Sequence, residues 1–327
     1  MARRNKGRPV HGILIVDKPT RLSSNFVVQR LKRRMHAQKA GHTGALDPMA
    51  TGVLPIVFGE ATKFSQYGLD ADKAYAATIQ LGVATTTLDA DGELTEQRGP
   101  VALDASHIEA ALLALTGRIT QIPPLISALK QDGKPWYKLA RQGVEVERRP
   151  REVTVYENRL VDFDAEQQTL DVMIRCSKGT YIRSLAESIA AELGTVAHLS
   201  GLRRIDAGGL DLSQATPLHL LEEHLLEGPD VCDSLLLPVD GLLSHIPRTD
   251  FDEEDCMTLI QGKKVFGPPN DLCHTMRAYL RGVGFIGLVQ ADTEGVITAK
   301  RMLSPAAAGM RGGSESGPLG SGMPFTE

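Results

Sequence analysis

The sequence GHTGALDPMATGVLP, residues 41–55, places one carboxylate and one imidazole among glycines, threonines and small apolar residues. Gly44 and Gly52 permit sharp turns or a close approach of the backbone to another group. Pro48 restricts its own φ and directs Asp47 toward an extended or turn conformation. Because apolar residues surround the acid, we expect a packed segment rather than a solvated loop.

Two interpretations of Asp47 compete. An Asp-Pro pair is a frequent turn starter, which gives the residue a purely structural role. A lone carboxylate on a rigid loop can instead act as a nucleophile or base. The stretch by itself favours the turn, so the remainder of the chain must decide.

Composition indicates an ordinary cytoplasmic protein. The chain has 327 residues, 42% of them apolar and 23% charged, enough for one large domain and a smaller one. Its apolar runs are too short to span a bilayer, and the N-terminus lacks the long apolar region of a secretory signal. The cysteines form no CxxC pair and have no histidine at metal-ligand spacing (Cys176, Cys232, Cys256 and Cys273). We expect reduced thiols and no zinc site.

The net charge of −4 conceals an asymmetry. Residues 1–39 contain eleven Lys and Arg against one acid, Asp17, a net charge of +10. A basic segment on an acidic protein is typical of a polyanion binder. The alternative is a solvated basic tail that only aids solubility.

Apolar periodicity predicts strands and helices along the chain. The expected strands are 11–17, 53–58, 73–81, 153–156, 170–177 and a piece beginning at 201–205. The expected helices run from Ser23 or Ser24 to Met35 and over 63–69, 107–116, 184–193, 213–226 and 235–243. The segment 85–93, TTTLDADGE, is polar turn material. Alternation over 73–81 puts Tyr75 on the apolar face of its strand, where a tyrosine is ordinarily part of the core.

Residues 121–151 change in character. They hold Trp136, Tyr137 and seven Lys and Arg against three acids. Basic residues interleaved with aromatic ones suit a loop or helix that clamps RNA through phosphate contacts and stacking, although a solvated basic face has the same composition. Further on, Tyr181 and Arg183 follow a glycine turn at the start of a helix, a natural place for anion or ligand contacts.

After Pro247 the sequence predicts a small β-rich module. A helix over 253–261 precedes short strands at 275–280, 285–291 and 296–303, which are separated by glycine turns. The Gly/Ser/Pro-rich residues 305–327 are predicted to be a disordered tail.

Eight motifs in order resemble the TruB family of tRNA pseudouridine synthases, specifically the bacterial enzymes that act on the T-arm. They are GILIVDKP (12–19), GHTGALDPMATGVLP (41–55), GEATKFSQY (59–67), KAYAATIQLG (73–82), TTTLDADGE (85–93), QIPPLISALKQDGKPWYKLARQG (121–143), KGTYIRSLAESIA (178–190) and GLRRIDAGGL (201–210).

The resemblance implies an α+β pseudouridine synthase fold: a central mixed, mainly antiparallel sheet flanked by helices and loops, plus a small β-rich PUA-like C-terminal domain. The expected organisation is a basic N-terminal arm (1–10), a catalytic domain (11–248) with an RNA-clamping insertion (121–151), an RNA-binding PUA-like domain (249–304) and the tail (305–327).

The activity implied by the resemblance is isomerisation of the T-loop uridine, position 55 of tRNA, to pseudouridine, with Asp47 as nucleophile. The N1–C1′ bond breaks, the flipped base rotates and it rejoins through C5, without cofactor or metal. An aspartate with an ordinary pKa is ionised at neutral pH, which suits attack on C1′ or C6, or stabilisation of positive charge at C1′. Those routes stay open.

Other roles follow from the same resemblance. Arg183 is expected to pair with Asp47 through a bidentate guanidinium and keep it ionised. Tyr75 is expected to stack on the target base and handle a proton, which reverses its assignment to the core. The substrate-binding residues would be Tyr181 and Leu202 in the uracil pocket, His42 at the T loop and Lys18 in the floor of the site.

Two positions depart from the family pattern: Arg21 stands where the family often has glycine, and Ile126 where it usually has an aromatic residue. The rival function is a non-catalytic RNA-binding protein or tRNA-folding chaperone, and a relative that modifies another RNA is the alternative among enzymes. The expected partner is the T-arm of tRNA. We expect a cytoplasmic monomer that needs neither a membrane nor a protein partner.

Overall fold

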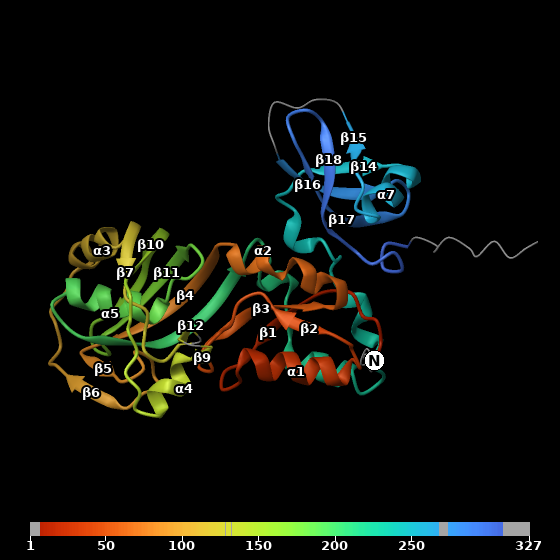
Figure 1. Ribbon diagram of the computed structural model, residues 1–327. Coiled ribbons are helices and arrows are strands. Elements are labelled where there is room, and N and C mark those ends of the chain that lie inside the picture. Colours follow the sequence, from red (N-terminus) through yellow and green to blue (C-terminus); the bar gives the residue numbers. More distant parts are fainter. Residues whose placement is uncertain (1–6, 128, 132, 268–273, 310–327) are drawn as a thin grey trace, which may run out of the picture. The chain divides into compact units, whose positions relative to one another are not determined.

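The computed structural model describes residues 7–127, 129–131, 133–267 and 274–309 (Figure 1). They form two compact units, divided between Leu242 and Leu243. Most of the predicted arm (1–10) and tail (305–327) lies outside the described residues. Arg8 belongs to the folded unit, because its guanidinium donates to Asp233 Oδ2 at 2.9 Å and to the Pro229 carbonyl at 2.6 Å. Among the described helices, none is long and apolar enough to cross a membrane.

The first unit is built on one mixed sheet. Its strand order is β13 (Thr216–Pro217), β1 (Gly12–Lys18), β3 (Thr51–Phe58), β12 (Ala197–Ala207), β4 (Lys73–Leu81), β11 (Thr169–Cys176), β10 (Arg151–Asp164) and β7 (Gly117–Gln121), with β2 (Ala40–His42) also paired to β3. Only the β1–β13 and β3–β12 pairs are parallel among the described strands of this sheet. The predicted mixed, mainly antiparallel sheet is confirmed.

Two backbone pairs join the halves of this sheet. Strands β3 and β12 meet only at Thr51 with Arg203 and at Gly52 with Arg204. Gly52 has φ +99°, and a Cβ there would lie 2.2 Å from the Arg204 carbonyl oxygen. The glycine therefore allows the two strands to approach, directly after the stretch that carries Asp47.

Three helices cover one face of the sheet: α1 (Ser24–Arg34), α3 (Ala105–Ala114) and α5 (Ile182–Glu192). Ser23 caps α1 by accepting a hydrogen bond from Phe26 N, as the sequence predicts. All three helices contribute to one hydrophobic core with alternate residues of β1, β3 and β4. The other residues of β1 and β3 enter a second, smaller cluster on the opposite face (Ile13, Ile15, Val53 and Val57).

One predicted helix begins later than expected, and another is wrong. Over 213–226 the chain forms a 3₁₀ turn (Leu212–Gln214), strand β13 and only then helix α6 (Leu218–His224), because Pro217 keeps Thr216 extended. Over 235–243 only the 3₁₀ turns Val231–Leu235 and Gly241–Leu243 form at the ends. Between them Leu237 exchanges backbone hydrogen bonds with Ile13, and Pro238 has no N–H to continue a helix.

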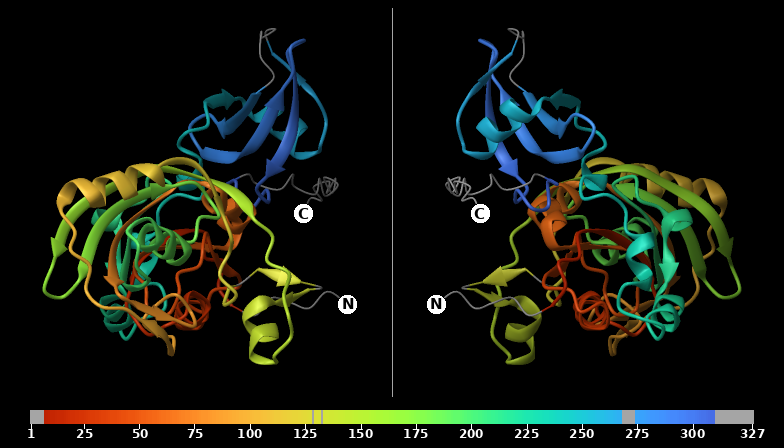
Figure 2. Two further views of the ribbon diagram at one scale, coloured as in Figure 1. Left: turned by 90° about the vertical axis from the view of Figure 1, so that its left-hand side faces the viewer. Right: turned by 90° about the vertical axis from the view of Figure 1, so that its right-hand side faces the viewer.

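The 121–151 segment stands away from the sheet (Figure 2). It contains the strands β8 (Lys130–Gln131) and β9 (Lys134–Pro135) and helix α4 (Trp136–Arg141). Its small core is formed by Trp136, Leu139 and Val146. Elsewhere in the first unit, η1 (Gly59–Phe64) leads into α2 (Ser65–Asp70), and β5 (Val83–Thr85) pairs with β6 (Leu94–Gln97).

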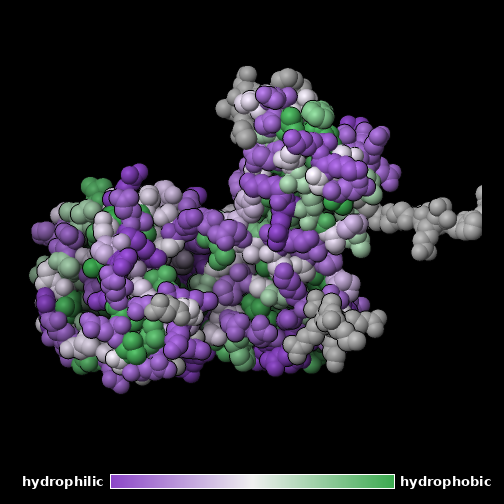
Figure 3. Space-filling view, in the orientation of Figure 1, coloured by the Kyte–Doolittle hydropathy of each residue, from purple (hydrophilic) through white to green (hydrophobic). Residues whose placement is uncertain are grey.

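The second unit confirms the predicted β-rich module. Its sheet has the order β14 (Arg248–Phe251), β16 (His274–Leu280), β17 (Gly284–Ala291), β18 (Val296–Met302) and β15 (Val265–Phe266), with helix α7 (Glu253–Ile260). The Arg248 guanidinium stacks 3.9 Å from the centre of the Tyr279 ring. Polar side chains dominate the visible surface of each unit, and apolar ones form only small groups there (Figure 3).

Candidate active site

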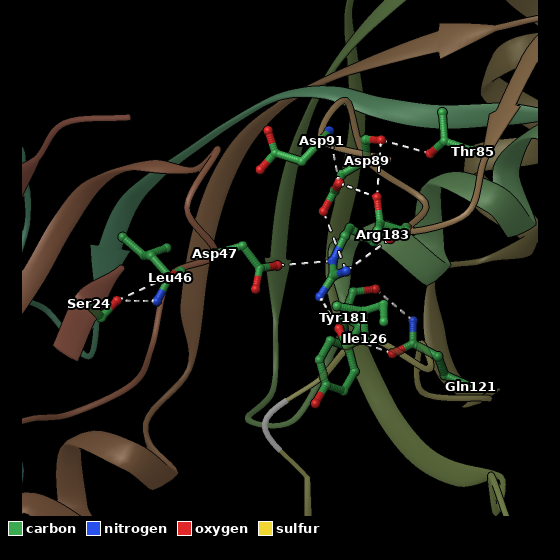
Figure 4. A network of polar contacts seen from close by, with 11 residues as sticks. Ser24, Leu46, Asp47, Thr85, Asp89, Asp91, Gln121, Ile126, Tyr181 and Arg183 are labelled. Carbon is green, nitrogen blue, oxygen red and sulfur yellow. Dashed lines mark hydrogen bonds and ion pairs between the residues drawn. The ribbon is translucent and has the colours of Figure 1, made fainter. Parts of the chain in front are cut away.

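Asp47 lies in the loop between β2 and β3, and hydrogen bonds on either side fix that loop. The Ser24 hydroxyl, at the start of α1, donates to the Leu46 carbonyl at 3.0 Å and accepts from Leu46 N at 2.7 Å (Figure 4). Ala50 N donates to the Asp47 carbonyl at 3.1 Å, which closes the Asp-Pro turn. The turn therefore holds the backbone of Asp47 and leaves its carboxylate free for other contacts.

The carboxylate of Asp47 forms an ion pair with Arg183 of α5, with 2.9 Å between Oδ2 and Nε. The Nε–H does not align with the oxygen well enough for a hydrogen bond. Nη1 donates to the Thr87 carbonyl and lies 3.4 Å from Asp89 Oδ2, while Nη2 donates to the Ile126 carbonyl. The expected bidentate pairing is therefore wrong, because both terminal nitrogens of Arg183 are engaged elsewhere.

Asp89 is a site residue that the sequence did not reveal. Its side chain is buried, accepts hydrogen bonds from Thr87 Oγ1 at 2.5 Å and Asp91 N at 3.1 Å, and forms a second ion pair with Arg183 besides that of Asp47 (Figure 4). The polar motif around it predicts only turn material. The residues that bury it come from distant parts of the chain, including Leu199, whose strand bridges to Asp89.

The environment raises the pKa of Asp47 above its ordinary value. Burial is the largest cause, the Arg183 guanidinium opposes it, and the nearby Asp89 carboxylate adds to the rise. The exposed part of the side chain, 41% of its surface, lines the cavity described below. The ordinary pKa assumed from the sequence is therefore too low, and Arg183 is the main group that keeps the carboxylate ionised.

A cavity of about 370 Å³ brings together five of the predicted site residues. Asp47, Tyr75, Tyr181, Arg183 and Leu202 all line it. This volume falls within the range of small-molecule pockets.

The two tyrosines of the cavity are held in different ways. Tyr75 projects from β4 and is only 9% exposed; burial raises the pKa of its hydroxyl, and the Arg204 guanidinium opposes that rise. Tyr181 caps α5, and its backbone N–H and C=O both bond to the Gln121 amide (2.7 and 3.0 Å). The Arg151 guanidinium stacks 4.6 Å from the centre of the Tyr181 ring.

Lys18 and His42 lie near Asp47 but do not line the cavity. Lys18 is fully buried, and its Nζ donates to three backbone carbonyls, those of Pro19, Leu22 and Pro48. Burial lowers the pKa of Lys18 to about 8. His42 Nδ1 accepts from Gly44 N at 3.3 Å, and burial also lowers its pKa. Both residues therefore support the Asp47 loop from outside the cavity.

Lys73 and Arg204 also line the cavity, although the sequence did not single them out. Nζ of Lys73 donates to three backbone carbonyls at the C-terminal end of α2 (Gly68, Leu69 and Ala71), and burial lowers the pKa of this lysine to about 8. Both residues lie in motifs quoted above, but composition does not distinguish Arg204 from its neighbour Arg203. Across the described part of the chain, no cluster of His, Cys, Asp or Glu could hold a metal ion.

Comparison with known proteins identifies the family. The profile described as "TruB family pseudouridylate synthase (N terminal domain)" matches residues 32–182, and "tRNA pseudouridylate synthase B C-terminal domain" matches residues 183–244. The chain belongs to the TruB family. The resemblance of the eight motifs is thereby confirmed.

Curated TruB relatives match nearly the whole chain. The tRNA pseudouridine synthase B of Neisseria gonorrhoeae (strain NCCP11945) is 45% identical over 92% of this chain and 97% of the relative. The corresponding protein of Stutzerimonas stutzeri (strain A1501) is 46% identical over 90% of this chain and 96% of its own. Among solved structures, the Cbf5 chain matched in a Cbf5-Nop10-Gar1 complex gives a TM-score of 0.70 at 22% identity, covering 95% of this chain and 93% of that one. That likeness confirms the pseudouridine synthase fold of the TruB chain.

Proposed function

We propose that this chain is a tRNA pseudouridine synthase that isomerises the T-loop uridine at position 55. The observation that carries the proposal is a single carboxylate, Asp47, ion-paired to a buried arginine in the wall of a cavity between two tyrosines. Its relatives named tRNA pseudouridine synthase B support the same substrate.

In the proposed mechanism, one oxygen of Asp47 is held and the other reacts. Arg183 contacts Oδ2, whereas Oδ1 has no hydrogen-bond partner among the described residues. Oδ1 is therefore the oxygen available to attack the nucleoside or to stabilise positive charge at C1′. As the N1–C1′ bond breaks, its electron pair moves to the base; the base rotates, C5 bonds to C1′, and the proton on C5 is lost.

The remaining cavity residues would bind the extruded uracil. Flipping a base costs a few kcal/mol and least in a loop, which suits a T-arm substrate. The Tyr75 ring would stack on the base and its hydroxyl handle a proton, while Tyr181 and Leu202 would close the pocket. His42 would help hold the T loop, and Lys18 would keep the Asp47 turn in place from outside the cavity.

We assign these roles to a monomeric protein with the catalytic residues in 11–248. The segment 121–151 would clamp the RNA, and the module 249–304 would be a PUA-like RNA-binding domain. The second candidate is a tRNA-binding or tRNA-folding protein without catalysis, which the basic segments favour. A carboxylate in the cavity argues against RNA binding without catalysis, because the carboxylate would repel a phosphate-rich ligand.

The variant Asp47→Asn tests the proposal. We expect pseudouridine formation in a tRNA transcript to be abolished while the tRNA dissociation constant stays within a few-fold, because the amide keeps the shape and loses the nucleophile. Asp164→Asn is the matched control, because Asp164 is exposed at the end of β10 and does not line the cavity, so the same substitution is made outside the site. Turnover by Asp47→Asn at the wild-type rate would refute the assignment.

The substrate is tested by mapping pseudouridine in unmodified tRNA after incubation with the purified protein. We expect modification at the T-loop uridine and nowhere else. Pseudouridine at another site would retain the activity and overturn the choice of substrate.

A further inference from the structure

Arg204 lies where the two halves of the sheet meet. In β12 it stands opposite Gly52 of β3 on one side and opposite Tyr75 of β4 on the other. Only 1% of its surface is exposed, and it is among the largest fully buried side chains of the described chain. It therefore lies between the loop of Asp47 and the strand of Tyr75.

The guanidinium of Arg204 holds the Asp47 loop on both sides of the carboxylate. Its Nε donates to the Val53 carbonyl at 2.7 Å, after Asp47 in the chain. Its Nη2 donates to the Gly44 carbonyl at 3.0 Å, and Nη1 lies 3.5 Å from the Ala45 carbonyl, both before Asp47. One planar group thus fixes the spacing of the two ends of the loop.

The charge of Arg204 is not neutralised by a carboxylate. Among the described residues, none of its ion pairs or hydrogen bonds involves an acid, and its acceptors are backbone carbonyls. Burying a cation without a counter-ion is costly. Because no carboxylate offsets this charge, it acts on the titratable groups around it. Burial is the largest cause of the lowered pKa of Lys18, His42 and Lys73, and the charge of Arg204 adds to it; the same charge opposes the rise that burial gives the pKa of Tyr75.

We propose that Arg204 is a positioning residue that fixes the Asp47 loop and keeps a positive charge beside the hydroxyl of Tyr75. This inference rests on the proposed function, since it concerns the same cavity. Two substitutions separate the parts of the role. Arg204→Lys keeps the charge but cannot reach all three carbonyls, whereas Arg204→Gln removes the charge.

The expected readout is the single-turnover rate at saturating protein, with tRNA affinity measured separately. We expect the rate to fall about tenfold in Arg204→Lys and about a hundredfold in Arg204→Gln, because small displacements of a reacting group cost that much. The tRNA dissociation constant should change by no more than a few-fold. Arg203→Gln is the matched control: Arg203 is half exposed, pairs with Asp17, and should keep the wild-type rate.

A second readout reports the charge. The ionisation of Tyr75 can be followed by the tyrosinate absorbance that disappears in Tyr75→Phe. We expect this ionisation to occur at higher pH in Arg204→Gln. It should also move to higher pH in Arg204→Lys, because a buried lysine at this place, like Lys18 and Lys73, loses its proton before Tyr75 ionises. A merely structural role would lower the thermal stability and leave this titration unmoved.

Two outcomes overturn the proposal: a wild-type single-turnover rate in Arg204→Gln, or an unchanged Tyr75 titration in that variant. Failure of the proposed function is distinguishable from failure of the role of Arg204, because in the first case the wild-type protein itself would form no pseudouridine. The Tyr75 titration would still test the contacts of Arg204 in that case.

Discussion

Arg183 contacts a different group with each of its three nitrogens. Nε faces Asp47, Nη1 contacts Thr87 and Asp89, and Nη2 holds Ile126 of the 121–151 segment. The cavity, the turn of Asp89 and the base of that segment therefore meet at one side chain.

The pH dependence of the reaction tests this arrangement. Activity that needs ionised Asp47 is lost as the pH falls through the pKa of Asp47, and Arg183 lowers that pKa. We expect Arg183→Gln to move the acidic limb of the single-turnover rate to higher pH, besides lowering the maximal rate. Asp91→Asn provides a control of opposite sign, because Asp91 raises the pKa of Asp47. An acidic limb that stays in place in Arg183→Gln would contradict the role of Arg183.

Individual side chains were predictable only where a motif surrounds them. Asp47, Tyr75 and Arg183 follow from the resemblance, whereas Asp89 looks like part of a solvated turn until β12 buries it. Arg21, which stands where the family often has glycine, adopts φ +66° and donates its N–H to the Pro48 carbonyl at 2.7 Å. An arginine therefore adopts the left-handed conformation that favours glycine. Its backbone hydrogen bond still connects the loop of Lys18 to the Asp-Pro turn.

At the scale of elements, the β3–β12 pair is the joint on which the cavity depends. The apolar pattern predicts β4 from its alternation and β3 from its continuous apolar run. It does not predict which strands become neighbours, since β3 and β12 pair over only two residues. The late start of the helix predicted over 213–226 and the absence of a helix over 235–243 have the same origin: prolines and contacts with β1 override apolar content that suits a helix.

The variant Gly52→Ala tests this joint. Gly52 has φ +99°, and a Cβ there would clash with the Arg204 carbonyl. We therefore expect the free energy of unfolding to fall by about 3 kcal/mol or more. Gly209→Ala is the control, because Gly209 has φ +82° but no atom within 4 Å of a Cβ, and should cost about 1 kcal/mol. Denaturant unfolding measures both. Equal losses of unfolding free energy in the two variants would show that the approach of β12 places no constraint on the side chain at position 52.

At the scale of the whole molecule, the distribution of charge matters more than its sum. The net charge is −4, yet the last turn of α1 presents Lys32, Arg33 and Arg34, of which the two arginines are exposed. The sequence left two interpretations of these residues, an RNA-binding surface or a solvated face. The fold places them on a helix rather than on a tail.

Salt dependence chooses between them. If both arginines contact phosphates, the double variant Arg33→Gln/Arg34→Gln should weaken tRNA binding and reduce the slope of log K against log salt by about two. The single-turnover rate at saturating protein should not change. Arg159→Gln, an exposed arginine paired with Glu157, serves as a control for the loss of surface charge. An unchanged slope in the double variant would identify the basic helix end as a solvated face.

The bonds between Arg204 and the Asp47 loop also fix an order of events during synthesis. The loop leaves the ribosome 160 residues before the arginine that binds Gly44, and 151 residues separate that arginine from Val53. Until β12 emerges, a nascent chain carries Asp47 on a loop that lacks the hydrogen bonds of Arg204 to Gly44 and Val53. The geometry of the cavity is therefore complete only when nearly the whole first unit has been made.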